Sequence, residues 1–155
     1  MAAPAAAVVE MTEPFERTVH GRWGDMDFNG HVRNTAYLDL AADLRMQCFA
    51  AQGFSMREFE RLRLGPVITR DDLEYFKEIR LLEPIRCTLS MAGLSRDGVR
   101  FRCRNEFYRG DGKLAVRVTS TGGWLSLEKR RMVQPPDELA AVMRAMARSQ
   151  DFEEL

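Results

Sequence analysis

The chain has 155 residues, 45% of them apolar, with 23 basic and 23 acidic side chains. A chain of this length buries roughly 70% of the surface it exposes when unfolded, so a single domain needs no disulfide or metal to hold its core. The zero net charge argues against a nucleic-acid partner, because nucleic-acid-binding domains carry excess basic charge, and no run approaches the roughly 20 apolar residues of a membrane span.

The beginning of the chain, residues 1–13, lacks the basic start of a secretory signal and contains a proline. We expect these residues to form a flexible leader, residues 14–150 to form a single domain, and residues 151–155 to form a short tail. The first element of the domain is expected to be a strand over residues 15–23.

A helix is predicted between Asn34 and Gln52. Apolar side chains recur there at the i, i+3, i+4, i+7 and i+11 spacing of one helix face, at Tyr37, Leu40, Ala41, Leu44 and Cys48. Further apolar residues lie on the neighbouring faces, so the helix is too apolar for a surface position and should be largely buried. Asn34 is the expected N-cap, and Gly53 the expected end.

The second half of the chain reads mainly as strands. We expect a linker over residues 54–65 and a strand over residues 66–76. Apolar and polar residues then alternate over residues 85–92 and 99–107, with Asp-Gly turns at 97–98 and 111–112, and a further strand runs over residues 114–127. A helix is expected to begin at Pro135. The order predicts an α+β fold in which one long buried helix is wrapped by a curved antiparallel sheet, with a C-terminal helix.

The chain has three cysteines, Cys48, Cys87 and Cys103. Their number is odd, and no CxxC or Cys/His spacing of a metal site is present. They are expected to be buried thiols in a reducing compartment, which favours a cytoplasmic protein without a metal.

Residues 25–37 form a loop dense in functional side chains, directly before the predicted buried helix. The loop holds two carboxylates, two carboxamides, a glycine and one of the two histidines. The free N–H groups at a helix N-terminus stabilise negative charge that develops on a carbonyl oxygen. A carboxylate beside them can act as nucleophile or base, so the two together suit attack on a carbonyl carbon without a metal or other cofactor.

The run D-x-D-x-x-G-H-V-x-N-x-x-Y in this loop, followed by an apolar helix, resembles the signature of hotdog-fold thioesterases of the 4-hydroxybenzoyl-CoA thioesterase-like superfamily. The spacing Asp27-x-Asn29-x-His31 is similar to the pattern of plant acyl-carrier-protein thioesterases, which share that fold. The order of elements agrees over roughly residues 15–146. The resemblance implies a hotdog fold, hydrolysis of an acyl- or aryl-CoA thioester, and assembly as a homodimer or homotetramer.

The resemblance also implies roles for individual residues. Asp27 matches the carboxylate that attacks the thioester or activates water, while Asn29 and His31 match residues that position the acyl group or assist the carboxylate. Asn34 matches the position whose backbone N–H polarises the thioester carbonyl. Gly30 is expected to form a turn beside the substrate, and Tyr37 to lie in the core or contact the substrate.

The segment of residues 96–117 carries seven basic and three acidic side chains, a net charge of +4 in a neutral protein. Arg100, Arg102 and Arg104 alternate and therefore share one face of a strand. They are candidates to bind the phosphates of CoA or an acidic acyl carrier protein, or they form a solvated face. The alternatives to an acyl-CoA thioesterase are an acyl-carrier-protein thioesterase and an acyl-CoA-binding protein without activity.

Overall fold

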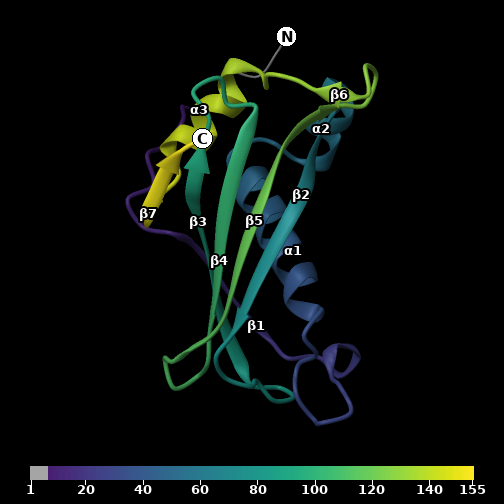
Figure 1. Cartoon of the computed structure of the whole chain (residues 1–155), viewed down its shortest axis with the longest axis vertical. Coiled ribbons are helices and arrows are strands. Elements are labelled where there is room, and N and C mark those ends of the chain that lie inside the picture. The colour runs from purple at the N-terminus through teal and green to yellow at the C-terminus, as the bar shows by residue number, and fades with distance from the viewer. Residues whose placement is uncertain (1–6) are drawn as a thin grey trace.

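The structure is a computed structural model that describes residues 7–155. A curved seven-stranded sheet wraps around helix α1 (Ala36–Ala51), which lies against its concave side (Figure 1). Five strands form the continuous path β1-β3-β4-β5-β2, and all pairs along it are antiparallel. Their bounds are β1 Phe15–His20, β2 Leu64–Tyr75, β3 Pro84–Leu94, β4 Arg100–Tyr108 and β5 Leu114–Ser126.

The remaining elements flank α1 in the chain or follow β5. A 3-10 turn, η1 (Trp23–Asp25), precedes α1, and helix α2 (Met56–Leu62) follows it. The short strand β6 (Arg131–Met132) pairs with β5, helix α3 (Asp137–Ala145) comes next, and strand β7 (Arg148–Glu154) pairs in parallel with β3. The expected α+β architecture, with a long buried helix, a curved antiparallel sheet and a C-terminal helix, is confirmed.

Helix α1 is buried along the face that meets the sheet. That face consists of Ala36, Tyr37, Ala41, Leu44, Cys48 and Phe49. Four of these six are positions that the apolar spacing predicts, whereas the fifth predicted position, Leu40, is only partly buried. The expected N-cap is wrong by one residue. Thr35 occupies the N-cap position, but its hydroxyl accepts from Arg33 Nε and does not cap the helix. Two tight turns, from Ala36 N to Arg33 O and from Leu38 N to Thr35 O, start the helix instead.

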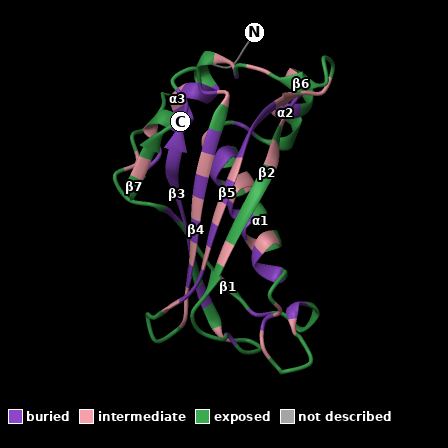
Figure 2. Ribbon diagram, in the orientation of Figure 1, coloured by how far each residue is buried: buried purple, intermediate pink, exposed green. Residues whose placement is uncertain are grey.

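The core continues from α1 into a group of aromatic rings around Trp124. The rings of Phe49, Phe59 and Phe101 lie 5.5, 5.7 and 5.5 Å from the Trp124 ring. Burial is concentrated on β3, β4 and β5, the central strands of the sheet (Figure 2). The three cysteines, Cys48 on α1, Cys87 on β3 and Cys103 on β4, are all buried, as expected.

The predicted linker over residues 54–65 is wrong, because helix α2 lies within it. Ser55 caps the helix by accepting a hydrogen bond from Glu58 N, and Arg63 ends it with a left-handed φ of 50°. With only seven residues, the helix is too short for a clear apolar period. Its burial of Phe59 against Trp124 depends on the tertiary fold.

The expected tail over residues 151–155 is wrong, because residues 148–154 form β7. Strand β1 pairs with residues 84–89 of β3, and β7 pairs with residues 91–94 on the same edge. The strand is fixed by ion pairs: Arg104 Nη1 and Nη2 each lie 3.0 Å from an Asp151 carboxylate oxygen, and Arg102 lies 3.1 Å from Glu153. An acidic strand facing arginines across β3 is a long-range pairing that no local pattern predicts.

The expected leader falls partly outside the described residues, which begin at residue 7. Within them, Met11 is bound to the domain, because its N–H donates to Ala145 O at 2.7 Å. No helix in residues 7–155 has the length and apolar character needed to cross a membrane.

Candidate active site

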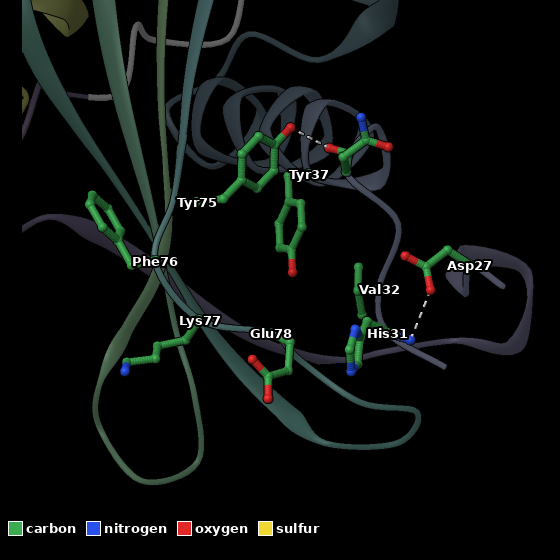
Figure 3. A pocket seen from close by; sticks show the side chains of 9 residues that line it. Asp27, His31, Val32, Tyr37, Tyr75, Phe76, Lys77 and Glu78 are labelled. Atoms are coloured by element: carbon green, nitrogen blue, oxygen red, sulfur yellow. Dashed lines mark hydrogen bonds between the residues drawn. The ribbon is translucent and has the colours of Figure 1, made fainter. Parts of the chain in front are cut away.

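A cavity of about 320 Å³ lies at the N-terminal end of α1. One wall comes from the functional loop and the first turn of the helix, and the other from the end of β2 and the residues after it (Figure 3). The residues that line it are Asp27, His31, Val32, Asn34, Tyr37, Tyr75, Phe76, Lys77 and Glu78. The structure thus brings Asp27, His31, Asn34 and Tyr37 together, as their predicted roles require.

The loop is anchored by Asp25, the first carboxylate of the motif, which is only 4% exposed. Arg22 donates two hydrogen bonds to it, at 2.8 and 3.0 Å, and these bonds lower the pKa of Asp25. The Asp25 carbonyl also accepts a hydrogen bond from Arg33 N at 2.7 Å. Asp25 therefore holds the two ends of the loop together and lies outside the cavity lining.

Asp27 organises the turn that follows. Its Oδ1 accepts hydrogen bonds from Asn29 N at 2.8 Å and from His31 N at 3.1 Å, while its own N–H donates to His31 O at 2.8 Å. Gly30 completes the turn with a φ of 75°, which glycine adopts without strain. The other carboxylate oxygen, Oδ2, has no hydrogen-bond partner within residues 7–155 and is available for chemistry.

His31 and Glu78 face the cavity from opposite walls (Figure 3). The His31 side chain is half-buried, and residue 31 forms an isolated β-bridge with Arg80 that joins the two walls. The pKa of Glu78 is lowered, first by a hydrogen bond from its own backbone N–H and then by electrostatic attraction to His31. The cavity therefore holds a second carboxylate besides Asp27.

Aromatic rings form the inner end of the cavity. Tyr37 is 2% exposed, and its ring packs edge-on against Tyr75 at 6.1 Å and Phe107 at 5.3 Å. Burial raises the pKa of the Tyr37 hydroxyl. Tyr37 is thus a core residue that also lines the cavity.

Five predicted catalytic or substrate-binding residues are absent from the cavity lining. Asn29 contributes its backbone N–H to the Asp27 turn, and both Asn29 and Gly30 are exposed. Arg100, Arg102 and Arg104 lie outside the cavity lining, on β4. Of these three, Arg102 and Arg104 are bound to the acidic residues of β7.

Four residues of the cavity lining have no role predicted from the sequence: Tyr75, Phe76, Lys77 and Glu78. Tyr75 and Phe76 are 51% and 47% exposed, although both are large and apolar. The exposed end of an edge strand is usually polar, so an aromatic pair at this position is a sequence signal for a functional site. Their position beside the functional loop, which lies far earlier in the chain, follows only from the fold.

The comparisons with known proteins identify the family of the chain. A family model for the thioesterase-like superfamily matches residues 21–143, well over half of the chain. A search of curated proteins by sequence gives no significant match.

Several solved structures share the fold. A hypothetical protein from Staphylococcus aureus, solved in complex with CoA, is 19% identical, with a TM-score of 0.77 over 91% of this chain and 89% of that one. The 1,4-dihydroxy-2-naphthoyl-CoA thioesterase from Synechocystis is 14% identical, with a TM-score of 0.75 over 84% and 95% of the two chains. The DHNA-CoA thioesterase from Staphylococcus aureus is 18% identical, with a TM-score of 0.75 over 83% and 88%. These similarities establish the hotdog fold, and the family match establishes that the chain belongs to the thioesterase-like superfamily.

Proposed function

We propose that the protein hydrolyses an acyl- or aryl-CoA thioester to the free acid and CoA. The observation that carries this proposal is the meeting of Asp27, His31 and the start of α1 around one cavity, in a member of the thioesterase-like superfamily. Structural neighbours solved with CoA or named as CoA thioesterases support the choice of carrier.

In the proposed reaction the Asp27 Oδ2 acts on the thioester carbon, either directly or through a water molecule. Direct attack forms an acyl-aspartyl anhydride and releases the CoA thiolate, and water then hydrolyses the anhydride. In the general-base route, Asp27 takes a proton from water as the water attacks, and the same two products form. Single turnover in H₂¹⁸O separates the routes, because only the anhydride route can leave ¹⁸O in the Asp27 carboxylate.

Negative charge on the thioester oxygen needs hydrogen-bond donors. The N–H of Asn34 has no acceptor within residues 7–155, and Asn34 lines the cavity at the positive end of the helix dipole. One such donor is typically worth about 10²- to 10³-fold in rate. We therefore assign the oxyanion site to the N-terminus of α1.

The deciding experiment measures release of the CoA thiol with a thiol reagent, using aryl, short-chain and long-chain acyl-CoAs. Three aromatic rings, those of Tyr37, Tyr75 and Phe76, line the cavity, so we expect an aryl-CoA to be the best substrate. Absence of turnover above background with every substrate would refute the proposal. Tight binding of an acyl-CoA without turnover would instead identify a non-catalytic binder.

The acyl-carrier-protein alternative depends on the arginines of β4 as a docking face for an acidic partner. Arg102 and Arg104 already bind acidic side chains of β7, which leaves this face little free positive charge for an acidic carrier protein. Comparing turnover of one acyl group on both carriers distinguishes the two functions.

We also propose that the protein assembles as a homodimer or homotetramer. Trp23, in η1, and Phe28, in the loop that carries Asp27, are 82% and 104% exposed. Large exposed apolar side chains beside a functional loop are typical of surfaces that a second copy covers. Light scattering coupled to size-exclusion chromatography tests this, and a strict monomer at assay concentrations would contradict it.

A further inference from the structure

The hydroxyl of Tyr75, at the end of β2, donates a 2.9 Å hydrogen bond to the backbone carbonyl of Asn34 (Figure 3). In a regular α-helix this carbonyl would accept from Leu38 N, but Leu38 N donates to Thr35 O at 3.2 Å instead. The pKa of Tyr75 is raised by burial, so its hydroxyl keeps its proton and acts as the donor. The bond therefore replaces a helical one at the first turn of α1.

Tyr75 is itself held rigidly by the sheet. It pairs with Val116 of β5, and the next two residues, Phe76 and Lys77, both donate to Ala115 O, at 2.7 and 3.1 Å. Its ring packs against Tyr37, which in turn packs against Phe107 of β4. The Tyr75 side chain is thus held by the sheet, and its hydroxyl bonds to the backbone at the start of α1.

The backbone on either side of the Asn34 carbonyl carries the donors that the reaction needs. Neither Asn34 N nor Thr35 N has a hydrogen-bond acceptor within residues 7–155. The carbonyl that Tyr75 binds belongs to the same peptide unit as the Thr35 N–H, and a hydrogen bond at one end of a peptide unit strengthens the donor at the other. Fixing this carbonyl also fixes ψ of Asn34, and with it the angle between the two N–H groups.

We propose that Tyr75 is a positioning residue of the thioesterase site, which acts through its bond to the Asn34 carbonyl to hold the N–H of Asn34, a residue that lines the cavity, toward the thioester oxygen. The inference rests on the proposed function and adds to it a residue outside the functional loop. Tyr75 does not take part in proton transfer or contact the reacting carbon.

The variant Tyr75→Phe tests the proposal, because it removes the hydroxyl and keeps the ring. With the best substrate of the panel we expect kcat to fall about tenfold, less than the 10²- to 10³-fold cost of deleting a donor, and KM to stay within twofold. Tyr75→Ala also removes the ring that lines the cavity, so it should raise KM as well. A Tyr75→Phe kcat within twofold of the parent value would overturn the proposal.

The matched control is Tyr108→Phe, which removes a tyrosine hydroxyl that bonds to Glu106 on β4, outside the cavity. It should leave kcat unchanged. A fall equal to that of Tyr75→Phe would assign the effect to general loss of stability and overturn the proposal.

Amide hydrogen exchange measured by NMR gives a second readout that needs no turnover. Ala36 N and Leu38 N are the hydrogen-bonded amides of this turn, since they donate to Arg33 O and Thr35 O. Their exchange should become at least severalfold faster in Tyr75→Phe than in the parent, and unchanged exchange would show that the Tyr75 bond does not order the turn. If the parent protein turns over no thioester, the proposed function fails, and this measurement still decides whether Tyr75 orders the N–H groups.

Discussion

Asp27 and His31 are joined by two reciprocal hydrogen bonds: His31 N donates to the Asp27 carboxylate at 3.1 Å, and Asp27 N donates to the His31 carbonyl at 2.8 Å. The carboxylate proposed for catalysis is therefore also the side chain that shapes its own loop. One oxygen serves the turn, and the other is left for the substrate.

The variant Asp27→Asn separates the structural role of the carboxylate from its proposed catalytic role. The amide oxygen can still accept from Asn29 N and His31 N, so the turn should survive, while the charge needed for attack or proton transfer is lost. We expect kcat to fall by about 10²-fold or more, with the melting temperature within a few degrees of the parent value. Asp27→Ala should lower both, because it also deletes the acceptor of the turn. Full activity in Asp27→Asn would remove the residue from its catalytic role.

The arginines of β4 lead to a second prediction. Replacing Arg100, Arg102 and Arg104 with glutamine should leave KM for CoA substrates unchanged, because all three lie outside the cavity lining and two of them are bound to acidic residues of β7. A KM that rises more than kcat falls would instead assign the CoA phosphates to these side chains. The triple change also releases β7, so the control is Asp151→Asn, which loosens β7 and keeps the arginines. An equal rise in KM in the control would place the effect in β7 instead.

The ion pair between β4 and β7 predicts a titration. Two hydrogen bonds from Arg104 hold the pKa of Asp151 at about 2, below its ordinary value of 3.8. A carboxyl with a pKa lowered by folding stabilises the fold fully above its unfolded pKa, and this contribution is lost as the pH falls through the folded value. β7 should therefore loosen between about pH 4 and pH 2.

NMR titration of the Asp151 carboxyl measures this pKa directly. Arg104→Gln should return it toward the ordinary value, and high salt should do so in part, because the Asp151 side chain is 63% exposed. An ordinary pKa in the parent protein would show that the ion pair does not persist in solution.

Gly122 gives a prediction about the fold alone. A methyl group at this position of β5 would lie 2.0 Å from the carbonyl oxygen of Val67, a backbone atom of the neighbouring strand. Gly122→Ala should therefore destabilise the protein by about 3 kcal/mol, as measured by urea unfolding. Gly24→Ala, where no atom lies within 4 Å, is the matched control and should be close to neutral.

The sequence predicts most of the fold where periodicity is strong. The 16 residues of α1 show a clear helical spacing, and β4 alternates buried and half-buried or exposed residues along its whole length. Helix α2 and strand β7 escape prediction because both depend on distant partners, Trp124 for the first and the arginines of β4 for the second.

The same limit applies to the site. The loop residues that meet at the cavity, among them Asp27 and His31, lie within one short motif and are predictable together. The opposite wall is brought to them by the pairing of β2 with β5, so Tyr75 and Glu78 have no local signal that connects them with the loop. Half of the cavity can be predicted from the motif, and half requires the sheet.

The burial of Cys48, Cys87 and Cys103 has a practical consequence for work on this protein. Burial raises the pKa of the Cys48 and Cys87 thiols to about 12 and that of Cys103 to about 11, so the folded chain offers a disulfide reagent almost no thiolate at neutral pH. Colour in a CoA-release assay then reports product alone. Adding denaturant at the end of each run should reveal three further thiols per chain, an internal measure of how much folded protein was present.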